Sequence, residues 1–389
     1  MLRLVKPPID KIIGINNLFK LDNRLDKVNL VIGAYKDCTG NNYIFKSVKE
    51  AVKKINKENY EYLPIEGDHT FLNLTKKLYF NDNNTHYDNI QTLSGTGALK
   101  IAGDFLSQTY NTYNKIPVIY LPDPTWDNHV NIFTSSGIAT STYRYLNNRK
   151  FTNEFLYDVI SKIPNNNIIL LHACAHNPSG YDLSYYGWCE ILELCKHKNL
   201  FPVIDMAYLG FASGNLKKDS KVLEILNKMH IPSLICCSFA KNFGLYSERV
   251  GTLFFCGNNN DETCIMKDIL KTIVRRSYSN PPANGSTIIK TILNDTNLTQ
   301  MWKNELNDIN IHYKSIRNML KTKLENIINE DFSDIVQQKG MFYYSNLTIE
   351  QVHTMRNNGI YMPDNGRISL AGINEQNVDH IVKMWQNII

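Results

Sequence analysis

The sequence has no long apolar run and no block of like charge. No stretch of the 389-residue chain approaches the ~18 consecutive apolar residues of a membrane-spanning helix. Charged residues of both signs are interspersed, the formal net charge is +5, and no basic tail supports nucleic-acid binding. The first eight residues lack the apolar core of a signal peptide. We therefore expect a cytoplasmic protein that binds neither membranes nor nucleic acids.

Cysteine is sparse and scattered, with eight residues in the chain. Cys236 and Cys237 stand together inside an apolar run, which is typical of buried reduced thiols rather than a disulfide framework. No Cys/His spacing indicates a metal site, so we expect no metal. His172 and His176 share one loop, but histidines without a carboxylate nearby are more often hydrogen-bonded loop residues than ligands.

Apolar runs and helical patterns alternate from about Gln91 to Cys256. Short buried strands are predicted at Val118–Leu121, Ile168–Leu171 and Pro202–Ile204. This alternation predicts an α/β fold with a mostly parallel sheet covered on both faces, in which the loops after the strands carry function. Apolar residues at three- and four-residue steps from Trp302 to Ile327 predict a long amphipathic helix that links two domains.

Lys241 follows an apolar run, Ile231–Cys237, that predicts a buried strand. Desolvation lowers the pKa of a lysine, and a neutral amine forms a Schiff base with an aldehyde. Arg249, eight residues further on, can give a phosphate planar bidentate contacts. An amine and a phosphate binder are the minimum requirement for pyridoxal phosphate (PLP), although lysines after strands are common and most are solvated.

Other loops add polar groups to this picture. Asp205 comes directly after a predicted strand, where a carboxylate is costly to bury without a positive partner such as a pyridinium nitrogen; the alternative role is capping of the next segment. Ser94, Gly95 and Thr96 open a predicted helix, and free amides there favour an anion, although ordinary helix caps look the same. Trp126 offers a flat face for an aromatic ring or a cap for the sheet.

Several further residues have two possible roles. Paired arginines such as Arg275 and Arg276 usually mark a solvated face, but here they precede a tight Asn-Pro-Pro break. Arg367, alone at a predicted strand start, is either an exposed salt-bridging residue or a bidentate binder of a carboxylate. Gly33 by itself indicates a bend in an apolar run. Asn177, before a proline, has its amide aimed from a turn.

Three strings together resemble the class I aminotransferases, in particular the aspartate aminotransferase subgroup. They are Leu170–Gly180, Asp205–Gly214 and Ser238–Gly251, the last reading SFAKNFGLYSERVG. The resemblance implies the PLP-dependent transferase fold of type I, a large domain with a mostly parallel sheet plus a smaller α+β domain. It further implies a small domain at 13–42 and 300–389 and a large domain at 43–299. The first dozen residues, with Pro7 and Pro8, are not expected to start a helix, so residues 1–12 are predicted to form an extended N-terminal arm.

The resemblance also implies a role for each candidate residue. Lys241 would form the Schiff base and move the substrate proton, Asp205 would keep the pyridine nitrogen protonated, and Tyr208 would assist them. The implied cofactor contacts are Ser94, Gly95, Thr96, Trp126, Asn177, Asp205, Tyr208, Ser238, Lys241 and Arg249, with Tyr62 from a second subunit. The implied substrate contacts are Gly33, Trp126, Asn177, Arg275 and Arg367, with Arg275 from the second subunit of a homodimer.

The implied reaction is reversible amino transfer between aspartate and 2-oxoglutarate. An aromatic-amino-acid aminotransferase of the same subgroup is the nearest alternative, because Arg275 favours dicarboxylates without excluding aromatic substrates. A PLP-binding sensor without turnover is the alternative from another class. Such regulators carry an added DNA-binding domain, for which we expect no room in this chain. Val31 and Asn346 stand where relatives tend to have glycine, and Ser179 keeps a hydroxyl where relatives have threonine.

Overall fold

The computed structural model describes residues 10–37, 40–56, 60–80, 85–110 and 118–389. Its contacts divide the chain into two compact units. The larger unit comprises residues 44–177 and 181–310, and the smaller unit comprises residues up to 43 together with 178–180 and 311–389. The domain boundaries predicted from the sequence stay a prediction beside this division.

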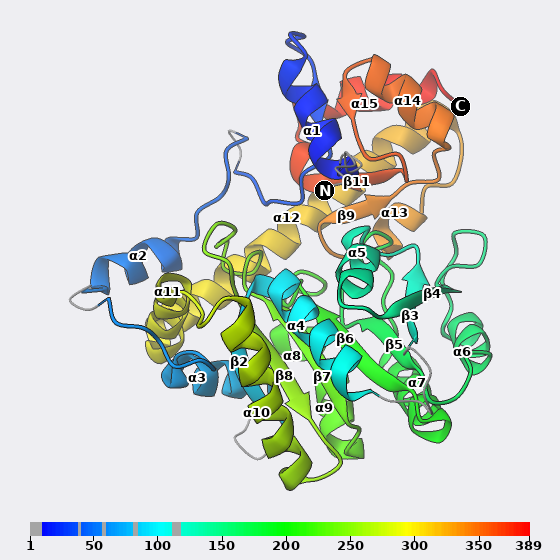
Figure 1. The fold of residues 1–389 in the computed structure, drawn as a ribbon. Helices are drawn as coiled ribbons and strands as arrows, with labels where there is room; N and C mark the ends of the chain where they lie inside the picture. Colours follow the sequence, from blue (N-terminus) through cyan, green and yellow to red (C-terminus); the bar gives the residue numbers. More distant parts are fainter. Residues whose placement is uncertain (1–9, 38–39, 57–59, 81–84, 111–117) are drawn as a thin grey trace, which may run out of the picture. The chain divides into compact units, whose positions relative to one another are not determined.

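The larger unit is built on one seven-stranded sheet (Figure 1). The strand order is β2-β8-β7-β6-β5-β3-β4, and only β8 runs antiparallel to its neighbours. The strands are β2 (Asp88–Leu93), β3 (Val118–Asp123), β4 (Ala139–Arg144), β5 (Ile168–His172), β6 (Phe201–Met206), β7 (Ser233–Ser238) and β8 (Val250–Cys256). The predicted α/β class with a mostly parallel sheet is confirmed.

Helices follow most of these strands. They are α2 (Lys46–Lys54), α3 (His69–Phe80), α4 (Ser94–Thr109), α5 (Asn128–Ser135), α6 (Asn153–Ser161), α7 (Tyr185–Lys198), α8 (Leu216–Asp219), α9 (Lys221–Met229), α10 (Asn260–Ser277) and α11 (Ala283–Asn294). Helices α4, α5 and α10 share one apolar core with alternate residues of the strands, among them Leu170 and Val203. Strands β5, β7 and β8 are buried at every residue, as expected for a sheet covered on both faces.

The order of the strands reverses between β3 and β5. From β3 the chain moves outward to β4, whereas from β5 it moves through β6 to β7 on the other side. At such a point the loops after the two central strands diverge and leave room for a ligand at the carboxyl ends of the strands. The segments that follow β3, β5, β6 and β7 carry Trp126, Asn177, Tyr208 and Lys241, respectively.

The smaller unit combines short strands and helices. Strand β1 (Val28–Asn29) pairs with β10 (Ile360–Tyr361) in parallel, and β9 (Phe342–Tyr344) pairs with β11 (Arg367–Ser369) in antiparallel fashion. Its helices are α1 (Lys11–Leu21), α13 (Asp334–Gln337), α14 (Ile349–Asn357), α15 (Val378–Gln386) and the 3-10 turn η1 (Leu370–Gly372). The predicted long helix is present as α12 (Thr296–Ile328), which runs from the larger unit into the smaller one.

The predicted N-terminal arm differs from the structure at its end. Residues 1–9 lie outside the described residues, but Asp10 accepts a hydrogen bond from the Ile13 amide and caps α1, which begins at Lys11. A side-chain oxygen at this position satisfies one of the free amides of the first turn, so the helix begins inside the predicted arm. None of the described helices combines the length and apolarity needed to cross a membrane.

Gly251, at the second residue of β8, is required by close packing rather than by backbone conformation. A Cβ atom there would lie 2.5 Å from the Cys237 carbonyl oxygen and 2.6 Å from the Ser94 carbonyl carbon. Both contacts are with backbone, which cannot rotate away. The glycine therefore lets the start of α4 approach the end of β7.

We expect Gly251→Ala to lower the free energy of unfolding by about 2–3 kcal/mol, because overpacking a close backbone contact costs this amount. Urea unfolding followed by circular dichroism measures the change. Gly40→Ala is the matched control: Gly40 has a φ of +82° but no atom within 4 Å of an added Cβ, so it should lose only about 1 kcal/mol through backbone strain. Equal losses in the two variants would contradict the packing argument.

Candidate active site

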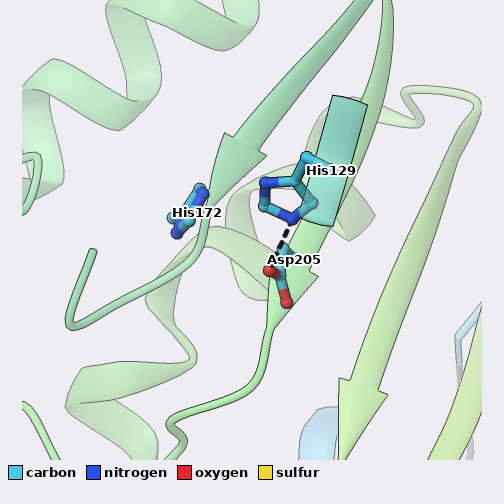
Figure 2. Close-up of side chains that lie close together, drawn as sticks. All are labelled: His129, His172 and Asp205. Atoms are coloured by element: carbon cyan, nitrogen blue, oxygen red, sulfur yellow. Dashed lines mark hydrogen bonds and ion pairs between the residues drawn. The ribbon is translucent and has the colours of Figure 1, made fainter. Parts of the chain in front are cut away.

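The floor of the candidate site is a buried carboxylate at the end of β6. Asp205 is 7% exposed and pairs in the sheet with His172 of β5. Its Oδ2 atom lies 3.1 Å from Nε2 of His129, as the dashed line in Figure 2 shows. Nδ1 of His129 in turn lies 2.8 Å from the Thr125 hydroxyl, which is 3.4 Å from Nε2 of His172. One hydrogen-bonded chain thus connects the loop after β3 with the ends of β5 and β6.

The surroundings of Asp205 keep its carboxylate ionised. Burial alone raises the pKa of a carboxyl group, but the hydrogen bond from His129 and the nearby His172 and Lys241 outweigh it and lower the pKa of Asp205. The histidines behave in the opposite way: burial lowers the pKa of His172 to about 3 and also lowers the pKa of His176. His172 and His176 are therefore neutral near the negative charge of Asp205.

His129, His172 and Asp205 also meet the spacing of a metal site, since one ligand atom of each lies within 4.8 Å of the others. The hydrogen bonds, however, already engage both ring nitrogens of His129. The three residues therefore resemble a hydrogen-bonded chain that orients the Asp205 carboxylate. They resemble less closely a set of ligands that converge on one metal ion.

A turn whose donors are suited to an anion lies where α4 begins. Ser94 has a φ of +62°, and its hydroxyl lies 2.9 Å from that of Ser238 at the end of β7. A Cβ on Gly95 would lie 3.1 Å from the Ser238 Cβ, so the two segments are in contact. Arg249, also at positive φ, donates one hydrogen bond to the Tyr246 carbonyl at 3.0 Å. The free amides of the first helical turn and this guanidinium offer donors from two directions.

The predicted cofactor residues surround one cavity of the larger unit. Lys241 extends over the Tyr208 ring, with Nζ 5.1 Å from the ring centroid. The residues that line the cavity are Ser94, Gly95, Thr96, Leu99, Trp126, Asn177, Asp205, Ala207, Tyr208, Ser238, Lys241 and Arg249. Every predicted cofactor contact except Tyr62 is among them. Larger cavities of about 910 and 510 Å³ lie elsewhere in the described residues, without a buried carboxylate beside a lysine.

Tyr62 and Arg275 are not part of this cavity. Tyr62 is 91% exposed in the segment before α3. Arg275 is exposed near the end of α10, where it donates a hydrogen bond to the Ser279 hydroxyl. Within one chain, both side chains point to solvent rather than into the group around Asp205.

Gly33 and Arg367 lie together in the smaller unit. The Arg367 guanidinium is 4.2 Å above the Phe342 ring and donates to the Val31 carbonyl at 2.8 Å. A Cβ on Gly33 would lie 2.6 Å from the same Phe342 ring. Arg367 is only 6% exposed, so its charge is held in a fixed place by the ring and the carbonyl. This excludes the freely exposed salt-bridging role and leaves a preorganised guanidinium.

Sequence reasoning did not find His129 or Thr125. Both lie in or after the loop that was singled out for Trp126, and His129 follows the tryptophan by three residues. The signal was a histidine one helical turn beyond a residue expected to face the site. The carboxylate that His172 was thought to lack is Asp205, which is distant in sequence and adjacent in the sheet.

Comparison with known proteins gives a consistent picture. Residues 25–384 match the family model described as aminotransferase class I and II. The chain is 38% identical over 389 residues to the mitochondrial aspartate aminotransferase of Dictyostelium discoideum, covering 97% of this chain and 90% of that protein.

Solved structures with the same fold include the broad-specificity aminotransferase of Leishmania mexicana, with a TM-score of 0.95, 31% identity and coverage of 99% and 97% of the two chains. The aromatic-amino-acid aminotransferase of Burkholderia pseudomallei, solved covalently bound to pyridoxal phosphate, has a TM-score of 0.93 at 32% identity, with coverage of 99% and 98%. These likenesses confirm the predicted fold of the PLP-dependent aminotransferases.

The neutral histidines predict how stability depends on pH. Because the pKa of His172 falls from 6.5 to about 3 on folding, below pH 6.5 the unfolded chain binds a proton that the folded chain does not. Stability should therefore fall as the pH falls from 6.5 towards 3, by about 1.4 kcal/mol per pH unit for this residue. Urea unfolding at pH 7, 6 and 5 should show a shallower dependence for His172→Gln. His197→Gln, at an exposed histidine, should keep the wild-type slope; the same slope in all three proteins would contradict the assignment.

Proposed function

The chain belongs to the family of class I and II aminotransferases, and from this premise we propose that it is an aspartate aminotransferase. It would transfer an amino group reversibly between L-aspartate and 2-oxoglutarate, giving oxaloacetate and L-glutamate, with PLP as cofactor. The observation that carries the proposal is the cavity in which Asp205, Lys241 and Arg249 meet. The cytoplasmic location stays a prediction, since the Dictyostelium relative is a mitochondrial protein by name.

The residues of the cavity fit PLP in chemistry and in order. The start of α4, with Ser94, Ser238 and Arg249, offers donors for a phosphate. Asp205, kept ionised and buried, is a partner for a protonated ring nitrogen, because a buried negative charge is costly unless a positive group meets it. Tyr208 and Asn177 line the wall between these ends and can hydrogen-bond the ring oxygen. When bound, PLP supplies an electron sink for negative charge at the substrate Cα.

The residues of the site would then divide the tasks of the reaction among them. Asp205 would keep a proton on the ring nitrogen, and His129 orients Asp205 by its hydrogen bond. Lys241 would hold the cofactor covalently through Nζ and, once released, would remove the proton from the substrate Cα. Trp126 would cover the ring face. Arg367, already desolvated against Phe342, would bind the α-carboxylate as a bidentate fork, assisted by the Gly33 amide.

We also propose that the enzyme works as a homodimer with shared sites. Tyr60 and Tyr62 are 88% and 91% exposed in one segment, and adjacent exposed aromatic side chains are typical of a protein surface that meets a partner. Tyr62 would reach the partner's phosphate site, and Arg275 would meet the distal carboxylate of the substrate there. This role for Arg275 would account for a dicarboxylate preference.

The primary test uses Lys241→Ala. Wild-type protein with PLP should show the visible absorption band of a PLP–lysine imine, and addition of aspartate should change this band. The variant should lose the band and its amino transfer should become negligible, because no other amine replaces Nζ. Absorbance spectra and a coupled oxaloacetate assay measure both effects. Wild-type turnover in Lys241→Ala would overturn the assignment.

The substrate preference and the shared site are tested with Arg275→Ala. A fixed guanidinium that pairs with a carboxylate in a partly dry site contributes about 2–4 kcal/mol, or roughly 30- to 1,000-fold. The variant should lose this factor in kcat/KM for aspartate and little for phenylalanine. Arg276→Ala, which removes the adjacent exposed arginine, is the matched control and should retain wild-type values. An aromatic preference in the wild type would instead favour the specificity of the Burkholderia enzyme.

Hybrid dimers distinguish a residue that acts across the interface from one that acts in its own chain. Lys241→Ala and Arg275→Ala subunits, unfolded and refolded together, should form hybrids with one complete site, built from Lys241 of one chain and Arg275 of the other. Aspartate turnover of the mixture should exceed that of either variant refolded alone. No gain despite hybrid formation would place Arg275 in the same chain as its lysine or outside the site.

A further inference from the structure

Asp219, the last residue of α8, is a buried carboxylate that the proposed reaction does not use. It is 3% exposed. Its Oδ2 atom accepts hydrogen bonds from the amides of Gly210 at 3.0 Å, Ala212 at 3.1 Å and Ser213 at 3.4 Å, and Oδ1 accepts one from the Ser213 hydroxyl at 2.5 Å. Burial raises the pKa of Asp219 to about 6, and the charge of Asp182 adds to the rise, while these hydrogen bonds oppose it. Burying a carboxylate is costly, and these hydrogen bonds offset the cost, so Asp219 and the segment that it binds depend on one another.

The segment that Asp219 binds follows strand β6, at whose end Asp205 lies. It comprises residues Tyr208–Gly214 and starts three residues after Asp205. The Phe211 amide donates to the Tyr208 carbonyl at 2.9 Å, which closes a turn behind the tyrosine. The amides held by Asp219 lie in and just after this turn, so the carboxylate fixes the path of the chain as it leaves Tyr208.

A second anchor holds the same segment from α12. Nδ2 of Asn310 donates to the Phe211 carbonyl at 3.1 Å. A Cβ on Gly210 would lie 2.9 Å from Cδ1 of Leu306, so the backbone is in close contact with the helix. Asp219 binds the amides of the segment and Asn310 binds a carbonyl. Between the two anchors the backbone has little freedom to shift.

We propose that Asp219 is a positioning residue, whose carboxylate holds segment Tyr208–Gly214 so that the Tyr208 ring keeps its place next to the Lys241 amine and directs its hydroxyl into the cavity. The inference rests on the proposed function. Three amides directed at one point need an acceptor, and an apolar residue of the same size would leave them buried and unpaired. Tyr208 itself is buried with its ring 5.1 Å from Lys241 Nζ, so a shift of its backbone would be transmitted to the hydroxyl.

The test compares two replacements of Asp219 with a matched control. Asp219→Leu keeps the size and removes both acceptors. Asp219→Asn keeps one oxygen that accepts from the amides, and its NH2 group can donate a hydrogen bond to the Ser213 hydroxyl oxygen. The control is Glu305→Leu: Glu305 is 7% exposed and also accepts from backbone amides, those of Lys46 and Ser47, but at the start of α2. Both leucine variants should lose stability.

The deciding measurement is the pH midpoint of the visible band of PLP bound to each protein. A tyrosine hydroxyl that donates to the ring oxygen stabilises its negative charge and favours loss of the imine proton. Displacement of Tyr208 should therefore raise the pH midpoint by about one unit or more. The reason is that the free energy of a hydrogen bond to a charged group corresponds to a pKa shift of at least about one unit. We expect the rise in Asp219→Leu, at most a small rise in Asp219→Asn, and none in Glu305→Leu.

A double variant tests whether the effect passes through Tyr208. Tyr208→Phe should raise the midpoint by itself, and Asp219→Leu added to it should give no further rise, because coupled residues are not additive. Additive shifts would overturn the proposal. So would a folded Asp219→Leu protein with a wild-type midpoint. Should Asp219→Leu not fold, Ser213→Ala and Asn310→Leu loosen the same segment, and wild-type midpoints in both would overturn the proposal.

Hydrogen exchange separates this inference from the proposed function. The amides of residues 210–213 should exchange at least tenfold faster in Asp219→Leu than in Glu305→Leu, whether or not PLP is added. Wild-type protein that gives no PLP band contradicts the aminotransferase proposal. A normal PLP band with unchanged exchange and an unchanged midpoint in Asp219→Leu contradicts the role of Asp219 alone.

Discussion

The structure of the site depends on one buried negative charge. Asp205 sits at the end of a central strand, and the unfavourable free energy of its burial is offset by His129 and by the positive groups near it. Around this charge lie His129, which orients the carboxylate by its hydrogen bond, and a cavity that accepts a cation. Lys241 and Arg249 line the same cavity. The cavity therefore combines a negative group, Asp205, with two basic side chains.

The site is precise because its loops are held by the backbone of the sheet. Close packing at Gly251 brings the start of α4 to the end of β7, and the contact between Ser94 and Ser238 joins the two segments. Ser94 and Arg249 both have positive φ, a conformation that costs free energy for residues with a side chain and is kept only where neighbours enforce it. Donors for an anion are thereby in place before a ligand arrives, so binding does not have to order them.

Much of this could be predicted from the sequence, and the limits are physical. Alternating apolar runs indicated the parallel sheet, and the strings around Lys241 and Asp205 indicated the cavity, because residues at the carboxyl ends of parallel strands converge. His129 was not found because its partner, Asp205, is distant in sequence. Asp219 was not found because it binds backbone amides, which no pattern of residue types records. The helix start at Lys11 was missed because one capping oxygen outweighed the prolines that precede it.

Substrate preference is less predictable from one chain than cofactor binding, and the structure shows why. Apart from Tyr62, the groups proposed for the cofactor converge on one cavity within the larger unit, where the ends of the strands position them. Tyr62 and Arg275 are exposed and lie outside this cavity, so any part they play at the site depends on the proposed homodimer. A long, flexible arginine has little positional information of its own. The chain is similar to both aspartate and aromatic-amino-acid aminotransferases, so one fold and one type of cavity accompany different specificities. In our proposal, the residues that a second subunit contributes set the preference of this chain.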